Sequence, residues 1–226
     1  MQPSPPRESF MSGHCCDHDH APAAIVSPRY RRVLWAALLI NAGMAAVEIV
    51  SSRMTGSVSL LADAADFMGD AANYAVSLWA LGVAAVWRAR TAWLKGLCMA
   101  LYGLGVLAVA LWQWRQGGLP QASAMGLIGA LALAANLAVA AMLYAFREGD
   151  ANMRAVWLCT RNDAIGNVAV LMAAALVAVS GQGWPDLVVA AGMAALGLTG
   201  GISVMRQARE ELREPHQHAP ESPPHA

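Results

Sequence analysis

Five residues whose side chains can bind metal ions lie in stretches that are otherwise almost free of charge. Asp63, Asp66 and Asp70 follow one another at offsets of three and four residues, and Cys159 and Asp163 are four residues apart. On a helix these offsets place the side chains on one face. Carboxylates this near to one another repel in a low dielectric unless protons or a cation offset their charge. Two antiparallel helices with such pairs could close a site of three carboxylates and one thiolate, which suits a divalent transition metal such as tetrahedral zinc.

The composition around these residues is that of an integral membrane protein. Apolar residues make up 57% of the 226-residue chain, and charged residues make up 13%. Only 16 charged residues lie between Val33 and Met205, whereas 14 lie in the two short ends. A soluble domain carries about 25% charged residues along its whole length, so this distribution excludes an ordinary soluble domain. The net charge is zero, so we expect no nucleic acid partner.

The apolar runs predict an all-α integral membrane protein with six transmembrane helices. A bilayer span needs about 20 apolar residues, and the runs lack the alternation that a membrane β-barrel requires. The predicted spans are 33–52, 57–82, 92–114, 122–146, 152–179 and 186–205. They divide the chain into an N-terminal tail at 1–32, a transmembrane domain at 33–205 and a short C-terminal tail at 206–226.

The basic residues predict the orientation of the chain. Twelve Lys or Arg residues fall on the side that carries both tails, whereas only Arg53 and Arg115 fall on the other side. Basic loops stay in the cytoplasm. We therefore expect a protein of the inner (plasma) membrane with both termini cytoplasmic.

The metal-binding residues of the two predicted helices lie at a common depth. At 1.5 Å per residue, Asp66 and Asp70 lie roughly 14 to 21 Å into the second span. Cys159 and Asp163 lie about 7 to 11 residues into the fifth span, which runs in the opposite direction. Ionisable groups at this depth are costly and usually serve a function. The predicted ligands near the middle of the bilayer are Asp66, Asp70, Cys159 and Asp163.

These motifs resemble those of the cation diffusion facilitator transporters. The stretch from Asn41 to Asp70 contains Glu48 and the run Thr55-Gly56-Ser57-Val58-Ser59-Leu60-Leu61-Ala62-Asp63-Ala64-Ala65-Asp66, and it is similar to the first two spans of that family. The stretch Cys159-Thr-Arg-Asn-Asp163-Ala-Ile-Gly-Asn167 is similar to the fifth span. The family's metal site has a His or Asp and an Asp four residues later in span 2, with a His and an Asp at the same spacing in span 5. Carried over by position, it comprises Asp66, Asp70, Cys159 and Asp163, with Cys159 in place of the usual histidine.

The resemblance implies a secondary transporter, not an enzyme, that exports a divalent cation by proton-coupled antiport. It implies no cofactor, and its partners are the metal ion, protons and the lipid bilayer. Zn²⁺ is the expected substrate, while Cd²⁺, Co²⁺ and Fe²⁺ stay open because carboxylates favour harder ions and a thiolate favours softer ones. Most family members carry a cytoplasmic metal-binding domain after the sixth span. About twenty residues follow Met205, so we expect a short form without that domain.

Two other functions stay open from the residues alone: a membrane protein that binds metal without transporting it, and a membrane-embedded metalloenzyme. The enzyme would need a general base beside an open metal position, but the chain has no His-Glu-x-x-His run and no histidine in a span. The small residues Gly197 and Gly201 fit either packing between helices or a homodimer.

Other polar residues surround the predicted site. Asp63 faces the same way as Asp66, so it belongs either to an exit path or to the structure of the bundle, and the same two roles apply to Glu48 and Asn41. Arg161 points away from Asp163 on a helical wheel, and we predict that it pairs with Glu48. Four asparagines are expected to form hydrogen bonds between helices: Asn41, Asn73, Asn162 and Asn167.

The histidines of the chain lie only in its two tails. The segment His14-Cys15-Cys16-Asp17-His18-Asp19-His20 is dense in soft and borderline ligands. It predicts either a segment that captures metal on the cytoplasmic face or an ordinary solvated tail. The candidate capture residues are His14, Cys15, Cys16, His18 and His20.

Overall fold

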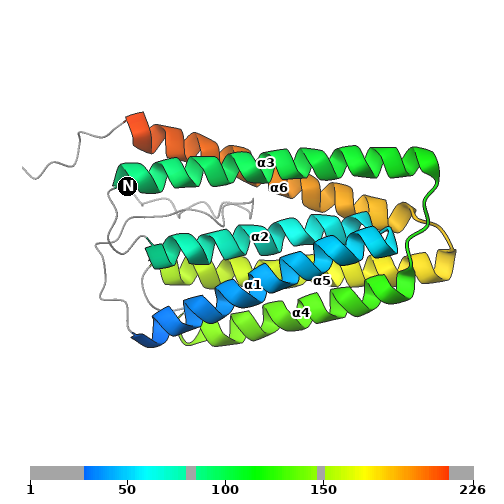
Figure 1. Cartoon of the computed structure of the whole chain (residues 1–226), viewed down its shortest axis with the longest axis horizontal. Helices are drawn as coiled ribbons and strands as arrows, with labels where there is room; N and C mark the ends of the chain where they lie inside the picture. Colours follow the sequence, from blue (N-terminus) through cyan, green and yellow to red (C-terminus); the bar gives the residue numbers. More distant parts are fainter. Residues whose placement is uncertain (1–27, 80–84, 147–150, 214–226) are drawn as a thin grey trace, which may run out of the picture.

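Six α-helices make up the part of the chain that the computed structural model describes, namely residues 28–79, 85–146 and 151–213, with side chains from residue 89 in the second range and from residue 163 in the third. The helices are α1 (Pro28–Thr55), α2 (Val58–Trp79), α3 (Ala85–Gln116), α4 (Ala122–Tyr144), α5 (Ala151–Ser180) and α6 (Trp184–Arg213). They run alternately in opposite directions, so that Pro28 and Arg213 lie at the same end of the bundle (Figure 1). The prediction of an all-α protein is confirmed.

Five of these helices contain stretches long and apolar enough to cross a membrane: α1, α3, α4, α5 and α6. The remaining helix, α2, has 22 residues and contains Asp63, Asp66 and Asp70. These acids interrupt its apolar sequence, yet α2 lies alongside the five apolar helices and packs against α1, α3, α5 and α6 (Figure 1). The architecture is that of an integral membrane protein with one acidic helix among apolar ones.

Two helices extend beyond the apolar spans predicted from hydropathy, while the predicted domain limits stay predictions. The first helix begins at Pro28, within the expected N-terminal tail, and α6 continues to Arg213, beyond the expected end at 205. Pro28 suits the first position of a helix because its ring fixes φ and that position needs no N–H donor. Hydropathy marks where the apolar part of a helix ends, whereas the helical hydrogen bonds of α6 continue into its charged last turns.

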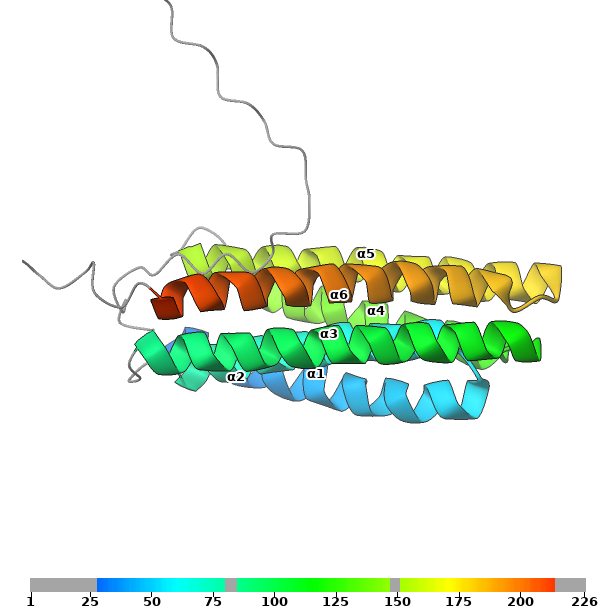
Figure 2. The same ribbon diagram turned by 90° about the horizontal axis from the view of Figure 1, so that it is seen from above.

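The helices form two groups. Helices α1, α2, α4 and α5 pack as a four-helix group, through the α1–α2, α4–α5, α1–α4 and α2–α5 contacts. Helices α3 and α6 form a pair beside it, which contacts the group mainly through α2 and α5 (Figures 1 and 2). The helices are nearly parallel in the view of Figure 2, whereas in that of Figure 1 α1 and α6 run at a slant to their neighbours.

The α3–α6 pair is held by a close approach of two backbones. A Cβ atom added to Gly96 would lie 2.6 Å from the carbonyl oxygen of Gly201, and one added to Gly201 would lie 2.6 Å from that of Gly96. Near the end of α6, the Arg209 guanidinium lies 5.8 Å from the centre of the Trp93 ring. Gly201 thus packs helices within the chain, whereas a Cβ on Gly197 would meet no atom within 4 Å. A homodimer stays a prediction.

Candidate metal site between α2 and α5

A buried aspartate from α6 fixes the start of the acidic helix α2. Asp186 is 0% exposed, and its carboxylate accepts hydrogen bonds from the backbone N–H groups of Val58 (2.7 Å) and Ser59 (3.1 Å). The hydroxyl groups of Ser57 and Ser59 also donate to it, at 2.7 and 2.6 Å. The first N–H groups of a helix lack partners within the helix, and an anion there is favourable. Asp186 therefore sets the position of α2, and through it the position of the acids further along.

Sequence reasoning did not predict this role of Asp186. Its partners lie 127 to 129 residues earlier in the chain, and no local pattern connects the two places. The available signals were an acidic residue in the first turn of α6 and two serines around the start of α2. Each is an ordinary helix-start feature by itself, so only the fold brings them together.

Asp70 is the best-connected acid of α2. It is 7% exposed, and its side chain lies within hydrogen-bonding reach of Asp163 on α5. The Tyr74 hydroxyl donates to it at 3.2 Å, and the ammonium of Lys95 on α3 acts on it electrostatically. Lys95 in turn donates to Asn73, one of the hydrogen bonds between helices that the sequence predicted. The structure thus brings together Asp70 and Asp163, two of the four predicted ligands.

Asp66 is half-buried and lies on the side of α2 that faces α5. Its Oδ2 atom is 4.0 Å from the place where a Cβ atom on Gly166 would be. Because Gly166 has no side chain, the carboxylate has room at this point of the interface. Asp66 and Asp70 are four residues apart on one helix face, and both approach α5 within one turn of Asp163.

The predicted four-ligand set is not assembled as such in the described part of the chain. No group of three or more His, Cys, Asp or Glu side chains among the described residues is arranged to hold a metal ion. Cys159 lies in α5, four residues before Asp163, but its side chain is outside the described residues. The ligand role of Cys159 therefore stays a prediction, as does the complete site.

Glu48 and Asp63 form a second acidic contact, between α1 and α2. Glu48 is 0% exposed and Asp63 is 1% exposed, and their carboxyl groups lie within hydrogen-bonding reach of each other. The Asn167 amide donates to both oxygens of Asp63, at 2.8 Å each, and Asn136 on α4 donates to Asn167 at 3.0 Å. These groups make a continuous polar line across the four-helix group. Asn167 thus bonds between helices, as predicted.

The other predicted polar residues either bond within their own helix or lie outside the described part of the chain. Asn41 is 0% exposed, but its amide donates to the carbonyl of Ala37 in its own helix, at 2.8 Å, and not to a neighbouring helix. The side chains of Arg161 and Asn162 are outside the described residues, so the predicted Arg161–Glu48 pair stays a prediction. The N-terminal candidates are also outside the described residues: His14, Cys15, Cys16, His18 and His20.

The sequence of the whole helical region matches a described protein family. Residues 34–213 match the cation efflux transmembrane domain, which covers all six helices from the first turns of α1 to the end of α6. The chain belongs to the cation diffusion facilitator family. The acids of the α2–α5 interface thus lie inside the transmembrane domain of a transporter family, and the resemblance of the span 2 and span 5 motifs is confirmed at the level of the family.

Two relatives illustrate the breadth of the cation diffusion facilitator match. One is a cadmium, cobalt and zinc/H(+)-K(+) antiporter of Bacillus subtilis (strain 168), 24% identical over 198 residues, which are 81% of this chain and 64% of that protein. The other is the metal cation efflux system protein CzcD of Cupriavidus metallidurans, 25% identical over 191 residues, which are 79% of this chain and 58% of that protein. The chain therefore spans about three fifths of the length of these relatives.

Proposed function

We propose that this protein moves a divalent metal cation out of the cytoplasm in exchange for protons, through a site between α2 and α5. The observation that carries the proposal is the approach of Asp70 on α2 to Asp163 on the antiparallel helix α5. Two neighbouring carboxyl groups in a low dielectric cannot both stay ionised without a compensating positive charge. They therefore hold either a proton or a cation. This competition is what antiport requires.

The proposed ligands are Asp66, Asp70 and Asp163, with Cys159 as the fourth. Three carboxylates and a thiolate suit a divalent transition metal, and Zn²⁺ is the first candidate because it accepts both ligand types in a tetrahedral arrangement. The relative from Bacillus subtilis is named as an antiporter of cadmium, cobalt and zinc, which supports this class of substrate. A Cys159→His variant compared with the parent protein across Zn²⁺, Cd²⁺ and Co²⁺ tests whether position 159 sets the preference.

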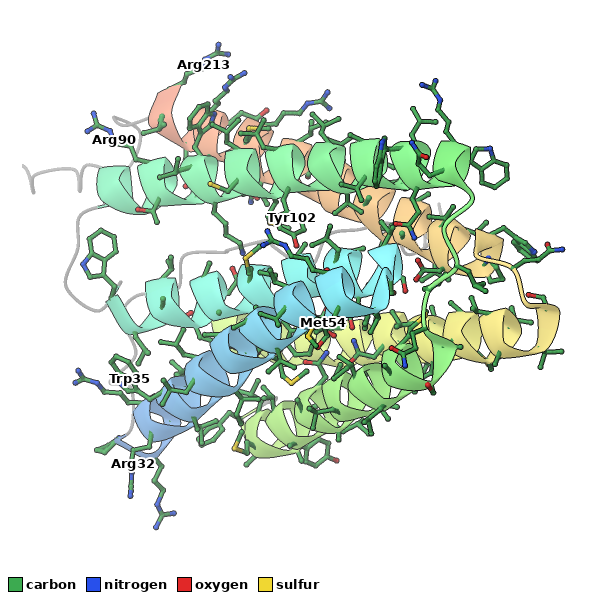
Figure 3. The ribbon with its side chains drawn as sticks, turned by 45° about the vertical axis from the view of Figure 1, so that its right-hand side comes forward. Arg32, Trp35, Met54, Arg90, Tyr102 and Arg213 are labelled. Atoms are coloured by element: carbon green, nitrogen blue, oxygen red, sulfur yellow. The ribbon has the colours of Figure 1, made fainter. Side chains whose placement is uncertain are left out.

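The distribution of basic residues supports an orientation of the bundle that the proposed export requires. Arg32, Arg90 and Arg213 lie at one end of the bundle, where the first and last described residues also lie (Figure 3). By the positive-inside rule this end faces the cytoplasm. In our proposal the metal enters from this end and displaces protons from the carboxyl groups, and protons that return from the opposite side release it. Rocking of helices around a central site is the general way in which transporters alternate access.

The test is metal and proton flux in liposomes that contain the full chain. Asp66→Asn and Asp163→Asn should each reduce Zn²⁺ flux to the background of empty liposomes, because each removes a proposed ligand and its charge. The matched control is Glu210→Gln, which neutralises an exposed acid near the end of α6 and should keep the parent flux. Full flux in both aspartate variants would contradict the site, and metal binding without flux in the parent protein would favour a non-transporting protein.

A further inference from the structure

The acidic contact between Glu48 and Asp63 lies apart from the one between Asp70 and Asp163. Glu48 lies seven residues before the end of α1, and Asp63 lies five residues after the start of α2. At 1.5 Å per residue, both are roughly 8 to 10 Å from the end of the bundle where α1 joins α2. Asp70 lies seven residues further along α2, toward the end of the bundle that carries Arg32, Arg90 and Arg213. The two contacts therefore occupy different depths.

The hydrogen bonds around Asp63 show which member of the pair accepts. Asn136 donates to the carbonyl oxygen of Asn167, and this fixes the Asn167 amide with its NH₂ group toward Asp63. The NH₂ group then donates to both Asp63 oxygens. Asp63 is thus held as an acceptor, which is the role of an ionised carboxylate.

Glu48 has the opposite surroundings. Neither of its buried oxygens receives a hydrogen bond from a described residue, and the group within reach is the carboxylate of Asp63. Two bare negative charges about 4 Å apart repel each other by about 4 kcal/mol even at an effective dielectric of 20. Removing two such charges from water without a counter-charge is more costly still. A proton on Glu48 resolves both problems, because its O–H group can donate to Asp63.

We propose that Glu48 and Asp63 form a second proton-binding site, which holds one proton while the metal site is empty and releases it when a divalent metal binds beside Asp66. The Asp66 charge contributes to the electrostatic potential at Glu48, so a divalent cation at Asp66 acts on Glu48 with the opposite sign. On metal binding the Glu48 O–H bond breaks, the proton leaves to water, and the metal's two positive charges offset the carboxylates. The reverse step reloads the proton as the metal departs. This inference rests on the function proposed above.

The charged groups that face Glu48 are few. Among the helices packed against α1, α2 contributes Asp63 and Asp66, whereas α4 has no acidic or basic residue between Ala122 and Tyr144. Tyr102 on α3, labelled in Figure 3, also interacts electrostatically with Glu48, but its hydroxyl donates to the carbonyl of Leu61 at 2.8 Å. Among the described residues, therefore, the partners that control the Glu48 proton are two aspartates of α2.

The decisive measurement is the number of protons released when the full chain in detergent binds Zn²⁺, obtained by calorimetry in buffers with different ionisation enthalpies. Glu48→Gln keeps a donor toward Asp63 but has no proton to release, so it should bind Zn²⁺ and release about one proton fewer than the parent protein. Asp63→Asn removes the other half of the pair and should show the same deficit. The double variant should show no larger deficit than either single one, because all three lack the same proton. Glu210→Gln is the matched control and should release the parent number.

Infrared difference spectra provide a second readout that a purely structural role would not change. Addition of Zn²⁺ should remove a protonated-carboxyl C=O band from the parent protein, and that band should be missing from Glu48→Gln before any metal is added. An equal proton count in the parent protein and both single variants would overturn the proposal. Loss of Zn²⁺ binding in Glu48→Gln would also overturn it, since Glu48 would then be a ligand. A different result would contradict the proposed metal site between α2 and α5: in that case Asp66→Asn would bind Zn²⁺ as the parent protein does.

Discussion

The α3–α6 pair and the four-helix group of α1, α2, α4 and α5 are held together by different kinds of contact. In the pair, two backbones approach so closely that neither Gly96 nor Gly201 has room for a methyl group. In the group, buried polar side chains join the helices, from Asn136 through Asn167 and Asp63 to Glu48. Contacts between backbones do not depend on protonation, whereas contacts between carboxyl groups do. The contacts that a metal ion or a proton can change among the described residues therefore lie within the four-helix group and where it meets the pair, at Asp186 and Lys95, and not in the glycine contact that holds the pair.

The largest expected effect comes from breaking the link between the two groups. Asp186→Ala removes the acceptor for two backbone N–H groups and two hydroxyl groups at the buried start of α2. We expect a loss of about 3 kcal/mol or more in the free energy of unfolding, because buried donors are left without a partner. Thermal unfolding in detergent, followed by circular dichroism, measures it. Glu210→Ala, at an exposed acid, should stay within about 0.5 kcal/mol of the parent protein.

The next effect should be confined to the α3–α6 pair. Gly201→Ala places a methyl group 2.6 Å from a backbone oxygen of α3, so the helices must separate, at a cost of about 1 to 3 kcal/mol in unfolding free energy. Gly197→Ala, whose methyl group would meet nothing within 4 Å, is the matched control and should be neutral or slightly stabilising. Zn²⁺ affinity of the folded protein should be the same in both. A large change in affinity with Gly201→Ala would mean that the pair is not a passive support.

A smaller effect is expected at the end of the polar line in the four-helix group. Asn136→Ala removes the donor to Asn167 and leaves a buried carbonyl oxygen without it, which should cost about 1 to 2 kcal/mol. Asn41→Ala is the comparison, because among the described residues the Asn41 amide donates to a carbonyl of its own helix and to no other helix. Unfolding of the two variants in the same detergent measures the difference. Equal losses would show that the hydrogen bond between helices contributes nothing beyond burial.

The smallest effect should appear in Zn²⁺ affinity rather than in stability. Lys95→Met removes a positive charge that acts on Asp70. The Lys95 charge repels a divalent metal twice as strongly as it repels a proton. Removing that charge should therefore tighten Zn²⁺ binding by about threefold to tenfold. Calorimetric titration at constant pH measures it, and Arg206→Met, at an exposed position in α6, is the control. Weaker binding in Lys95→Met would show that Lys95 positions Asp70 instead of opposing the metal.

The sequence predicted the parts of this molecule that follow from periodicity and composition. The six helices and the shared face of Asp66 and Asp70 follow from apolar length and helical spacing, whereas the meeting of α2 with α5 was expected from ligand residues paired at a common depth and from the family resemblance. It could not predict the contact of Gly96 with Gly201, because glycines are common in apolar helices and their partners depend on how the helices cross.

The contact of Glu48 with Asp63 was also beyond the sequence. Both residues were recognised as unusual, yet their pairing depends on the rotation of α1 against α2, which apolar periodicity fixes poorly where helices are apolar all around. Helices α1 and α6 extend beyond the predicted apolar spans for a related reason, since hydropathy reports the apolar stretch and not the helical hydrogen bonds.

The buried carboxylate of Asp186 also determines how the acidic helix can move. Four donors at the first turn of α2 bind this one side chain of α6. A shift of the helix by one residue that keeps its side chains packed into the same places combines a rise of about 1.5 Å with a turn of about 100°. Such a screw motion would turn Asp66 and Asp70 away from α5, and it cannot begin without releasing Asp186. The hydrogen bonds to Asp186 thus fix one end of α2. The depth and the direction of Asp66 and Asp70 then follow from their distance along the helix from that end.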